Sequence, residues 1–229
     1  AIALTLSEVG ITVDCLPLLD VRGPETHDAI GDRAFGNEPL RVASLGRAVI
    51  DGLKAGSVVG IVKHMPGQGR ALVDSHHELP TVSASADDLA QDLAPFAALK
   101  NAPMGMTAHV VFEAWDAERC ATMSPVVIQD IIRGQIGFTG LLMSDDLDMK
   151  ALKGDVPQRA ADCVAAGCDI ALNCWGRFDE MVAIANLLPE ITADARTRLD
   201  TAMATIRPVD HFDRIAALTE KRDALLALA

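Results

Sequence analysis

Short apolar runs alternate with alanine-rich segments of helical periodicity along most of the chain. The runs are apolar nearly throughout rather than at every second position, which is typical of strands covered on both faces. Strands that alternate with helices in this way form a parallel sheet, open or closed. We therefore expect an α/β fold. The predicted strands cover residues 11–19, 57–62, 104–110, 140–144 and 168–173.

Helices are indicated between and after these strands by their periodicity and by their capping residues. Ser85 precedes a segment with two acidic residues in its first turn, and Ser124 precedes a proline, which is favoured at the first helical position. Gly56, Gly140 and Gly167 lie between a predicted helix and a predicted strand, where a left-handed helix stop is common. The predicted helices cover residues 39–54, 86–99, 124–135, 156–166, 178–188, 192–205 and 208–227.

Polar and ionisable residues follow the predicted strands rather than precede them. Lys63 and His64 follow the second strand, His109 ends the third, and Asp145 follows the fourth. Barrel enzymes place their chemistry at the carboxyl ends of several strands, whereas an open doubly wound sheet concentrates it at one switch point. The ionisable residues follow several different strands, and this distribution favours a (β/α)8 TIM-type barrel. Because only five strands are visible and the chain opens in what reads as the second half of a helix, we expect residues 1–229 to form a single catalytic barrel domain that lacks its first N-terminal strands.

The formal net charge of −12 argues against nucleic acid or an anionic membrane as a partner, because both require a basic surface. No apolar run approaches the roughly 20 residues that a bilayer span requires, and no signal-peptide pattern opens the chain. The five cysteines include no CxxC pair, so we interpret them as reduced thiols. We expect a cytoplasmic protein without a cofactor that acts on a small molecule, and we favour a monomer.

The loop that follows the second strand, "KHMPGQGRALVDSHHELP" (63–80), concentrates ionisable side chains. Asp74 and His76 are two residues apart, so their side chains share one face of an extended backbone. An aspartate bonded to an imidazole fixes the tautomer and raises the basicity of the ring, which makes the pair a candidate general acid/base. Two alternatives stay open: a solvated loop, and a metal site that His109 would complete.

The stretch "GLLMSDDLDM" (140–149) places three acidic residues directly after an apolar strand. Asp145 is the first residue beyond the apolar run and should point toward the mouth of the barrel. The alternative is ordinary helix N-capping, for which aspartate is well suited. Asp146 and Asp148 could be capping or solvated residues even if Asp145 takes part in the chemistry.

Arg33 lies in a glycine-flanked loop that follows the first predicted strand. Its guanidinium could bind hydroxyls or a carboxylate with two parallel hydrogen bonds. The alternative is a surface ion pair with Asp32 or Glu38. Local sequence does not decide between the two.

Together, the motifs "IGDRAFG", "KHMPGQG", "DSH", "TAHV" and "SDDLDM", in this order and spacing, closely resemble the bacterial β-N-acetylglucosaminidases of glycoside hydrolase family three that act in cell-wall recycling. The resemblance runs from about residue 1 through Gly176. It implies a (β/α)8-type barrel. It also implies that a terminal β-linked N-acetylglucosamine is removed from peptidoglycan fragments (GlcNAc-1,6-anhydroMurNAc peptides) with retention, through a covalent glycosyl-aspartate.

The resemblance also implies roles for individual residues, and it implies neither a metal nor a cofactor. Asp145 falls on the nucleophile of the family, His76 on its acid/base, and Asp74 on the residue paired with that histidine. The sugar-binding positions fall on Arg33, Lys63 and His64.

Two features depart from the family pattern. The glycine turn of the family usually reads Gly-His-Gly, whereas this chain has Gln68 between its two glycines. A "DQEGGRV"-type segment, which supplies an Asp and an Arg to the sugar, has no counterpart in the sequence. We therefore keep a second hypothesis, in which the chain is a non-catalytic sugar-binding or structural fragment of such an enzyme.

Overall fold

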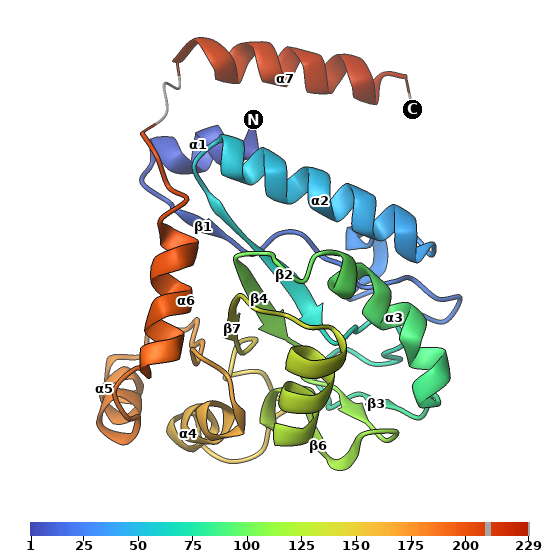
Figure 1. The fold of residues 1–229 in the computed structure, drawn as a ribbon, viewed down its shortest axis with the longest axis vertical. Helices are drawn as coiled ribbons and strands as arrows, with labels where there is room; N and C mark the ends of the chain where they lie inside the picture. The colour runs from blue at the N-terminus through green and yellow to red at the C-terminus, as the bar shows by residue number, and fades with distance from the viewer. Residues whose placement is uncertain (209–211, 229) are drawn as a thin grey trace.

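The computed structural model of the protein describes residues 1–208 and 212–228, and it is built around a parallel sheet (Figure 1). The four strands of this sheet are in the order β1-β2-β4-β7. All three neighbouring pairs are parallel, which confirms the predicted α/β fold. The strands are β1 (Val13–Asp14), β2 (Val59–Met65), β4 (Met104–Thr107) and β7 (Leu141–Met143).

The first and last predicted strands are much shorter than their apolar runs. The run 11–19 contributes only β1 and a single bridge between Leu18 and Lys63, because Pro17 interrupts the ladder. The run 168–173 contributes only a bridge between Ile170 and Met143. There the Ser144 hydroxyl accepts a hydrogen bond from the Leu172 backbone N–H (2.9 Å), in place of a backbone carbonyl.

The predicted helices are present, with some changes at their ends. The Ser85 hydroxyl accepts a hydrogen bond from the Asp88 N–H (3.2 Å), as expected of an N-cap. Of the three predicted left-handed stops, Gly167 has a positive φ of 120°, but Gly56 has a φ of −99° and Gly140 is not left-handed. The helices are α1 (Ile2–Glu8), η1 (Gly31–Arg33), α2 (Pro39–Ala55), α3 (Ala86–Ala98), η2 (Ala121–Met123), η3 (Val127–Gln135), α4 (Val156–Ala166), α5 (Phe178–Leu187), α6 (Ala193–Met203) and α7 (Phe212–Leu226).

Two of these helices differ from their sequence predictions in more than their ends. The segment 127–135 is a π-helix rather than an α-helix. The predicted helix 208–227 is represented by α7, and its residues 209–211 lie outside the described residues. In the described part of the chain, no helix combines the length and the apolar character that crossing a bilayer requires.

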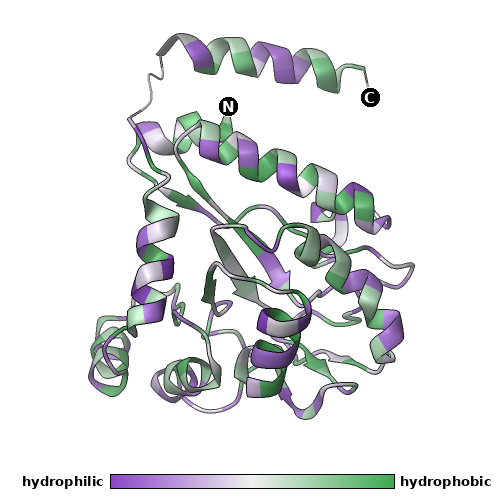
Figure 2. Ribbon diagram, in the orientation of Figure 1, coloured by the Kyte–Doolittle hydropathy of each residue, from purple (hydrophilic) through white to green (hydrophobic). Residues whose placement is uncertain are grey.

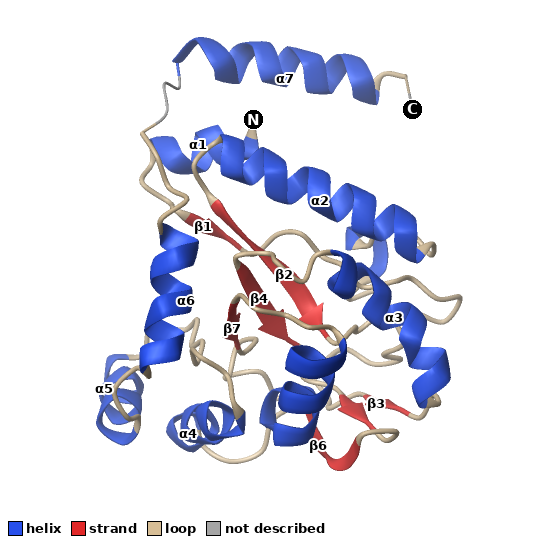
Figure 3. Cartoon of the chain, viewed as in Figure 1, coloured by secondary structure: helices blue, strands red, loops and turns tan. Residues whose placement is uncertain are grey.

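A second, smaller sheet was not predicted (Figure 3). It consists of β3 (Thr81–Val82), β5 (Val111–Phe112) and β6 (Asp116–Cys120), with β3 parallel and β6 antiparallel to β5. The predicted strand 104–110 therefore ends early, at Thr107, and the chain continues into this sheet. The two residues of β3 and of β5 are too few to produce a detectable hydrophobic period, and the five residues of β6 are mostly polar and exposed.

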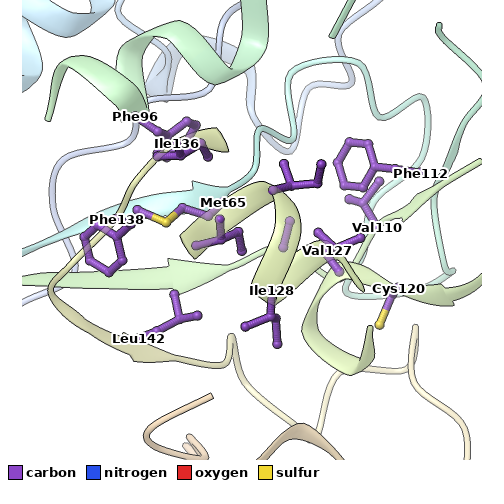
Figure 4. Close-up of a cluster of buried hydrophobic side chains, with 14 of the residues drawn as sticks. Met65, Phe96, Val110, Phe112, Cys120, Val127, Ile128, Ile136, Phe138 and Leu142 are labelled. Carbon is purple, nitrogen blue, oxygen red and sulfur yellow. The ribbon is translucent and has the colours of Figure 1, made fainter. Parts of the chain in front are cut away.

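The larger core lies between one face of the parallel sheet and the helices that cover it. Met65 of β2 and Leu142 of β7 belong to this core, together with Phe96 of α3, Ile128 of η3 and Phe138 (Figure 4). Figure 2 shows that the covering helices carry hydrophobic and hydrophilic residues on different sides, as amphipathic surface helices do. This core fixes the strands whose carboxyl ends carry the candidate site.

The opposite face of the sheet forms a separate apolar cluster with α6. Alternate residues of β2 and β4, such as Ile61 and Met104, contact Leu199, Ala202 and Met203 of that helix. An apolar sheet face must be covered by another element. A closed barrel would cover this face with its own strands, whereas here α6 lies on it. The described strands therefore form an open sheet, and the predicted (β/α)8-type barrel, expected to lack its first N-terminal strands, is not detected in this part of the chain.

Gly60 allows α2 to approach β2 closely, which leads to a prediction. A Cβ at this position would lie 2.6 Å from Ile50 Cδ1 and 2.8 Å from the Leu16 carbonyl oxygen. We expect Gly60→Ala to lower the free energy of unfolding by about 1–3 kcal/mol, measured by urea denaturation.

The matched control is Gly52→Ala in α2, where a Cβ meets nothing within 4 Å. It should raise stability by about 0.5–1 kcal/mol, because alanine is the better helix former. Equal effects of the two substitutions would contradict this account of Gly60.

Candidate functional site

The candidate site lies at the carboxyl ends of the parallel strands. Asp145 follows β7, His64 lies near the end of β2, and Asp20 follows the segment that begins with β1. The imidazole of His64 stands between the two carboxylates. Its Nδ1 is 2.8 Å from Asp20 Oδ2, and its Nε2 is 3.8 Å from Asp145 Oδ2.

Asp20 is a buried anchor that was not predicted from the sequence. It is completely inaccessible to solvent, and Oδ1 accepts hydrogen bonds from the backbone N–H groups of His64 (3.3 Å) and Gln68 (2.6 Å). A buried carboxylate requires such donors, because desolvation without them is costly. Asp20 could have been found by the same signal that identified Asp145, because it is also an acidic residue directly after an apolar run.

The surroundings of Asp145 favour its charged form. Burial alone raises the pKa of this carboxyl, but the imidazoles of His64 and His109, the Asp146 backbone N–H and the Lys63 ammonium together lower the pKa below its ordinary value. The N–H of Asp146 donates to Asp145 Oδ1 at 2.8 Å. The side chain remains 18% exposed, so one side of the carboxylate is open to a ligand.

His109 supports the loop that carries Asp145. The ring is fully buried, and burial lowers its pKa, which favours the neutral form. Nε2–H then donates to the Asp146 carbonyl oxygen (3.0 Å), and Nδ1 accepts from the Thr122 hydroxyl (2.8 Å). Both ring nitrogens are therefore occupied by hydrogen bonds. Within residues 1–208 and 212–228, no group of three or more His, Cys, Asp or Glu side chains is arranged to hold a metal ion.

Asp74 and His76 form the expected pair, but in a turn closed by the His77 and Glu78 backbone N–H groups on the Asp74 carbonyl oxygen rather than on the predicted extended backbone. Asp74 Oδ1 is 2.6 Å from His76 Nδ1 and accepts the His76 backbone N–H at 2.9 Å. Desolvation raises the pKa of Asp74, but these hydrogen bonds and the nearby imidazoles of His76 and His77 lower it overall. The His76 side chain is 61% exposed, and Nε2 is the ring nitrogen not used by Asp74.

The segment that carries this pair is attached at two points. Gln68 Nε2 donates to the Ser75 hydroxyl (3.1 Å), and the Lys150 N–H donates to the His76 carbonyl oxygen (3.4 Å). The amide of Gln68 thus links the glycine turn to the loop, at the position where the family usually has histidine. No hydrogen bond or ion pair joins His76 to Asp145 among the residues that the structure describes.

Lys63 and Arg33 lie differently with respect to the site. Lys63 is half-buried near the end of β2, and its charge acts on Asp145. Arg33 is exposed, and its guanidinium donates to the Ala29 carbonyl oxygen one helical turn earlier. The predicted alternative of an ion pair with Asp32 or Glu38 is not observed. The predicted role of Arg33 in sugar binding stays a prediction.

The two acidic residues after Asp145 connect the end of β7 to the segment 173–177. Asp146 Oδ1 accepts the Cys174 N–H (3.2 Å), and Oδ2 accepts the indole N–H of Trp175 (3.1 Å). Asp148 forms an ion pair with Arg177 (2.6 Å). Neither side chain caps a helix, so the predicted capping alternative does not apply to them.

Comparison with known proteins identifies a family and several relatives. The model of the glycosyl hydrolase family 3 N-terminal domain matches residues 1–207. A β-hexosaminidase of Chromobacterium violaceum is 38% identical over 214 residues, which cover 91% of this chain and 59% of that protein. A β-hexosaminidase of Nitrosomonas eutropha is 37% identical over 226 residues, which cover 93% of this chain and 64% of that protein.

Solved structures of similar proteins share the fold. NagZ from Neisseria gonorrhoeae in complex with N-trifluoroacetyl-D-glucosamine has a TM-score of 0.79 at 35% identity, over 91% of this chain and 60% of that chain. A glycoside hydrolase family 3 β-N-acetylglucosaminidase from Paenibacillus has a TM-score of 0.82 at 30% identity, over 93% and 44%. The chain thus spans less than two thirds of the length of the curated relatives described above.

The role of Asp20 can be tested by its removal. Asp20→Ala leaves three buried donors of His64 and Gln68 without an acceptor, so we expect a loss of about 2–4 kcal/mol in the free energy of unfolding. Asp32→Ala is the control, because Asp32 is exposed and should change stability by less than about 0.5 kcal/mol. Similar values for the two variants would contradict the anchoring role.

Proposed function

The chain belongs to glycosyl hydrolase family 3, and we propose that it carries the active site of a retaining β-N-acetylglucosaminidase. The observation that carries this proposal is an ionised aspartate, Asp145, at the end of a parallel strand, in a chain segment that hydrogen-bonds, through the Lys150 N–H, the loop that holds an aspartate–histidine pair. The β-hexosaminidase relatives and the N-acetylglucosamine analogue bound to the Neisseria protein support this specificity.

In the first step, Asp145 attacks the anomeric carbon of the terminal sugar. His76 Nε2 gives its proton to the glycosidic oxygen as the bond to the leaving group breaks, and a glycosyl ester of Asp145 forms. Retaining glycosidases usually employ two carboxylates about 5–5.5 Å apart. An imidazole in place of the second carboxylate does not raise the pKa of the nucleophile by like-charge repulsion.

In the second step, His76 takes a proton from water, and the water oxygen attacks the anomeric carbon. The ester bond breaks, Asp145 regains its charge, and the sugar leaves with its original configuration after two inversions. Asp74 holds the Nδ1 proton of His76 and stabilises the imidazolium form. The two roles of His76 require the same nitrogen, Nε2, to face the sugar in both steps.

We further propose that the loop 70–80 moves on binding the substrate. His76 must reach the glycosidic oxygen beside Asp145, and its exposed position is compatible with a loop that closes over the sugar. Lys63, His64 and Arg33 would bind ring hydroxyls and so position the anomeric carbon for attack.

The natural substrates that we propose are peptidoglycan fragments, GlcNAc-1,6-anhydroMurNAc peptides, processed in the cytoplasm.

We also propose that the parallel strands belong to a (β/α)8 barrel. The order of the strands and the similarity to other family structures support the barrel. The helix α6 covers the sheet face that a closed barrel would enclose with its own strands. This position favours the second candidate, a fragment that retains the sugar-binding motifs without turnover.

The proposed nucleophile, Asp145, can be tested by its removal. Asp145→Ala should lower hydrolysis of a chromogenic N-acetylglucosaminide by roughly 10³-fold or more, because the covalent step is lost. A fluorinated substrate analogue that traps the glycosyl-enzyme should label Asp145, as detected by peptide mass spectrometry. Asp32→Ala serves as the control and should retain full activity. A parent protein without turnover would support the non-catalytic fragment instead.

The proposed proton donor, His76, can be tested with substrates that differ in their leaving groups. His76→Ala should slow substrates with poor leaving groups by about 10²–10⁴-fold, but activated aryl glycosides far less, because only the former need protonation. The measurement is kcat/KM across a series of leaving groups of increasing pKa. Equal losses along the whole series would mean that His76 has a structural role.

A further inference from the structure

We propose that Trp175 forms a platform for the leaving-group sugar, the ring on the far side of the cleaved bond. This inference rests on the proposed glycosidase function and names a specificity-determining residue for it. No role was assigned to Trp175 from the sequence.

Trp175 is held next to the proposed nucleophile by hydrogen bonds through Asp146. Asp145 Oδ1 accepts the Asp146 N–H, and Asp146 Oδ2 accepts the Trp175 indole N–H. The preceding residue is held by the same carboxylate, since the Cys174 backbone N–H donates to Asp146 Oδ1 (3.2 Å). The indole is thus attached to the rim of the site rather than to a remote surface.

The indole is both exposed and fixed in orientation. Trp175 is 65% exposed, although the part of the chain around β7 buries most of its apolar side chains. The Arg177 guanidinium lies 5.9 Å from the ring centroid, and the Trp175 backbone N–H donates to Asn173 Oδ1 (3.2 Å). Arg177 is in turn held by ion pairs with Asp148 and Glu180. These contacts leave much of the ring surface open to solvent.

An exposed and oriented indole suits a pyranose ring. Sugars present apolar C–H faces that pack on aromatic rings, and binding clefts combine such aromatic surfaces with a few polar groups. Single exposed hydrophobic residues are common and need no explanation by themselves. Trp175 differs from these because its polar edge is satisfied by Asp146 and because, although the Arg177 guanidinium lies over one face, the residue remains 65% exposed. Aromatic residues make up only 3% of the chain, so the placement of one beside Asp145 is informative.

Two substitutions separate this role from a purely structural one. Trp175→Phe keeps an aromatic face but loses the N–H donor to Asp146, whereas Trp175→Ala loses both. Phe178→Ala is the matched control, because Phe178 is an exposed aromatic residue (74%) at the start of α5. If the indole acts through its face, the Phe variant should behave like the parent protein.

The experiment measures binding, so it does not depend on turnover. Calorimetry gives Kd for N-acetylglucosamine and for thio-linked N,N′-diacetylchitobiose, a disaccharide that resists hydrolysis. We expect the parent to bind the disaccharide about tenfold more tightly than the monosaccharide. Trp175→Ala should lose this preference with an unchanged Kd for the monosaccharide, while Trp175→Phe and Phe178→Ala should keep it.

Three results would overturn the proposal: no preference for the disaccharide in the parent, equal weakening of both sugars by Trp175→Ala, or equal losses in the Ala and Phe variants. The last result would assign Trp175 to the support of Asp146. Turnover of ordinary N,N′-diacetylchitobiose is assayed separately. A parent that shows the expected preference but no turnover contradicts the proposed function and leaves the role of Trp175 supported.

Discussion

The candidate site depends on one buried interaction, the contact between the Asp20 carboxylate and the His64 imidazole. Asp20 fixes Nδ1 of the ring and the backbone of the glycine turn at the same time. The other ring nitrogen is thereby directed toward Asp145. The same turn carries Gln68, which holds Ser75 in the loop of the Asp74–His76 pair. One desolvated carboxylate therefore connects the strand that precedes it, the end of β2 and the proposed acid/base loop.

The consecutive carboxylates at the end of β7 have different partners and therefore different roles. Asp145 receives one backbone hydrogen bond and faces imidazoles, which keeps it charged and accessible. Asp146 accepts hydrogen bonds from the Asp148 and Cys174 backbone N–H groups and from the indole of Trp175. His109 secures the backbone directly after them through the Asp146 carbonyl oxygen. The reactive group is thus held through Oδ1 by a backbone N–H, while Oδ2 faces His64 Nε2 at 3.8 Å.

Much of this arrangement could be predicted from the sequence, because it depends on local patterns. Asp145 follows an apolar run, and the pairing of Asp74 with His76 was predicted from their spacing, although a turn rather than an extended backbone brings them together. Asp20 gave the same signal as Asp145, but a single acidic residue after a strand does not reveal whether it is buried. The packing of α6 also could not be predicted, because an amphipathic pattern does not specify which sheet face it covers. The exposed position of Arg33 follows from the turn geometry of η1, which no periodicity encodes.

The unequal exposure of Asp145 and His76 has a consequence for the origin of the transferred hydrogen. Asp145 is largely enclosed, whereas most of the His76 ring faces solvent. An imidazole in contact with bulk water exchanges its labile hydrogen far faster than a typical enzyme completes a cycle. In the proposed reaction, the hydrogen given to the leaving group therefore comes from the solvent. It is not the hydrogen that His76 took from the attacking water in the preceding cycle. In heavy water, His76 would therefore transfer deuterium to the glycosidic oxygen from the first turnover onward.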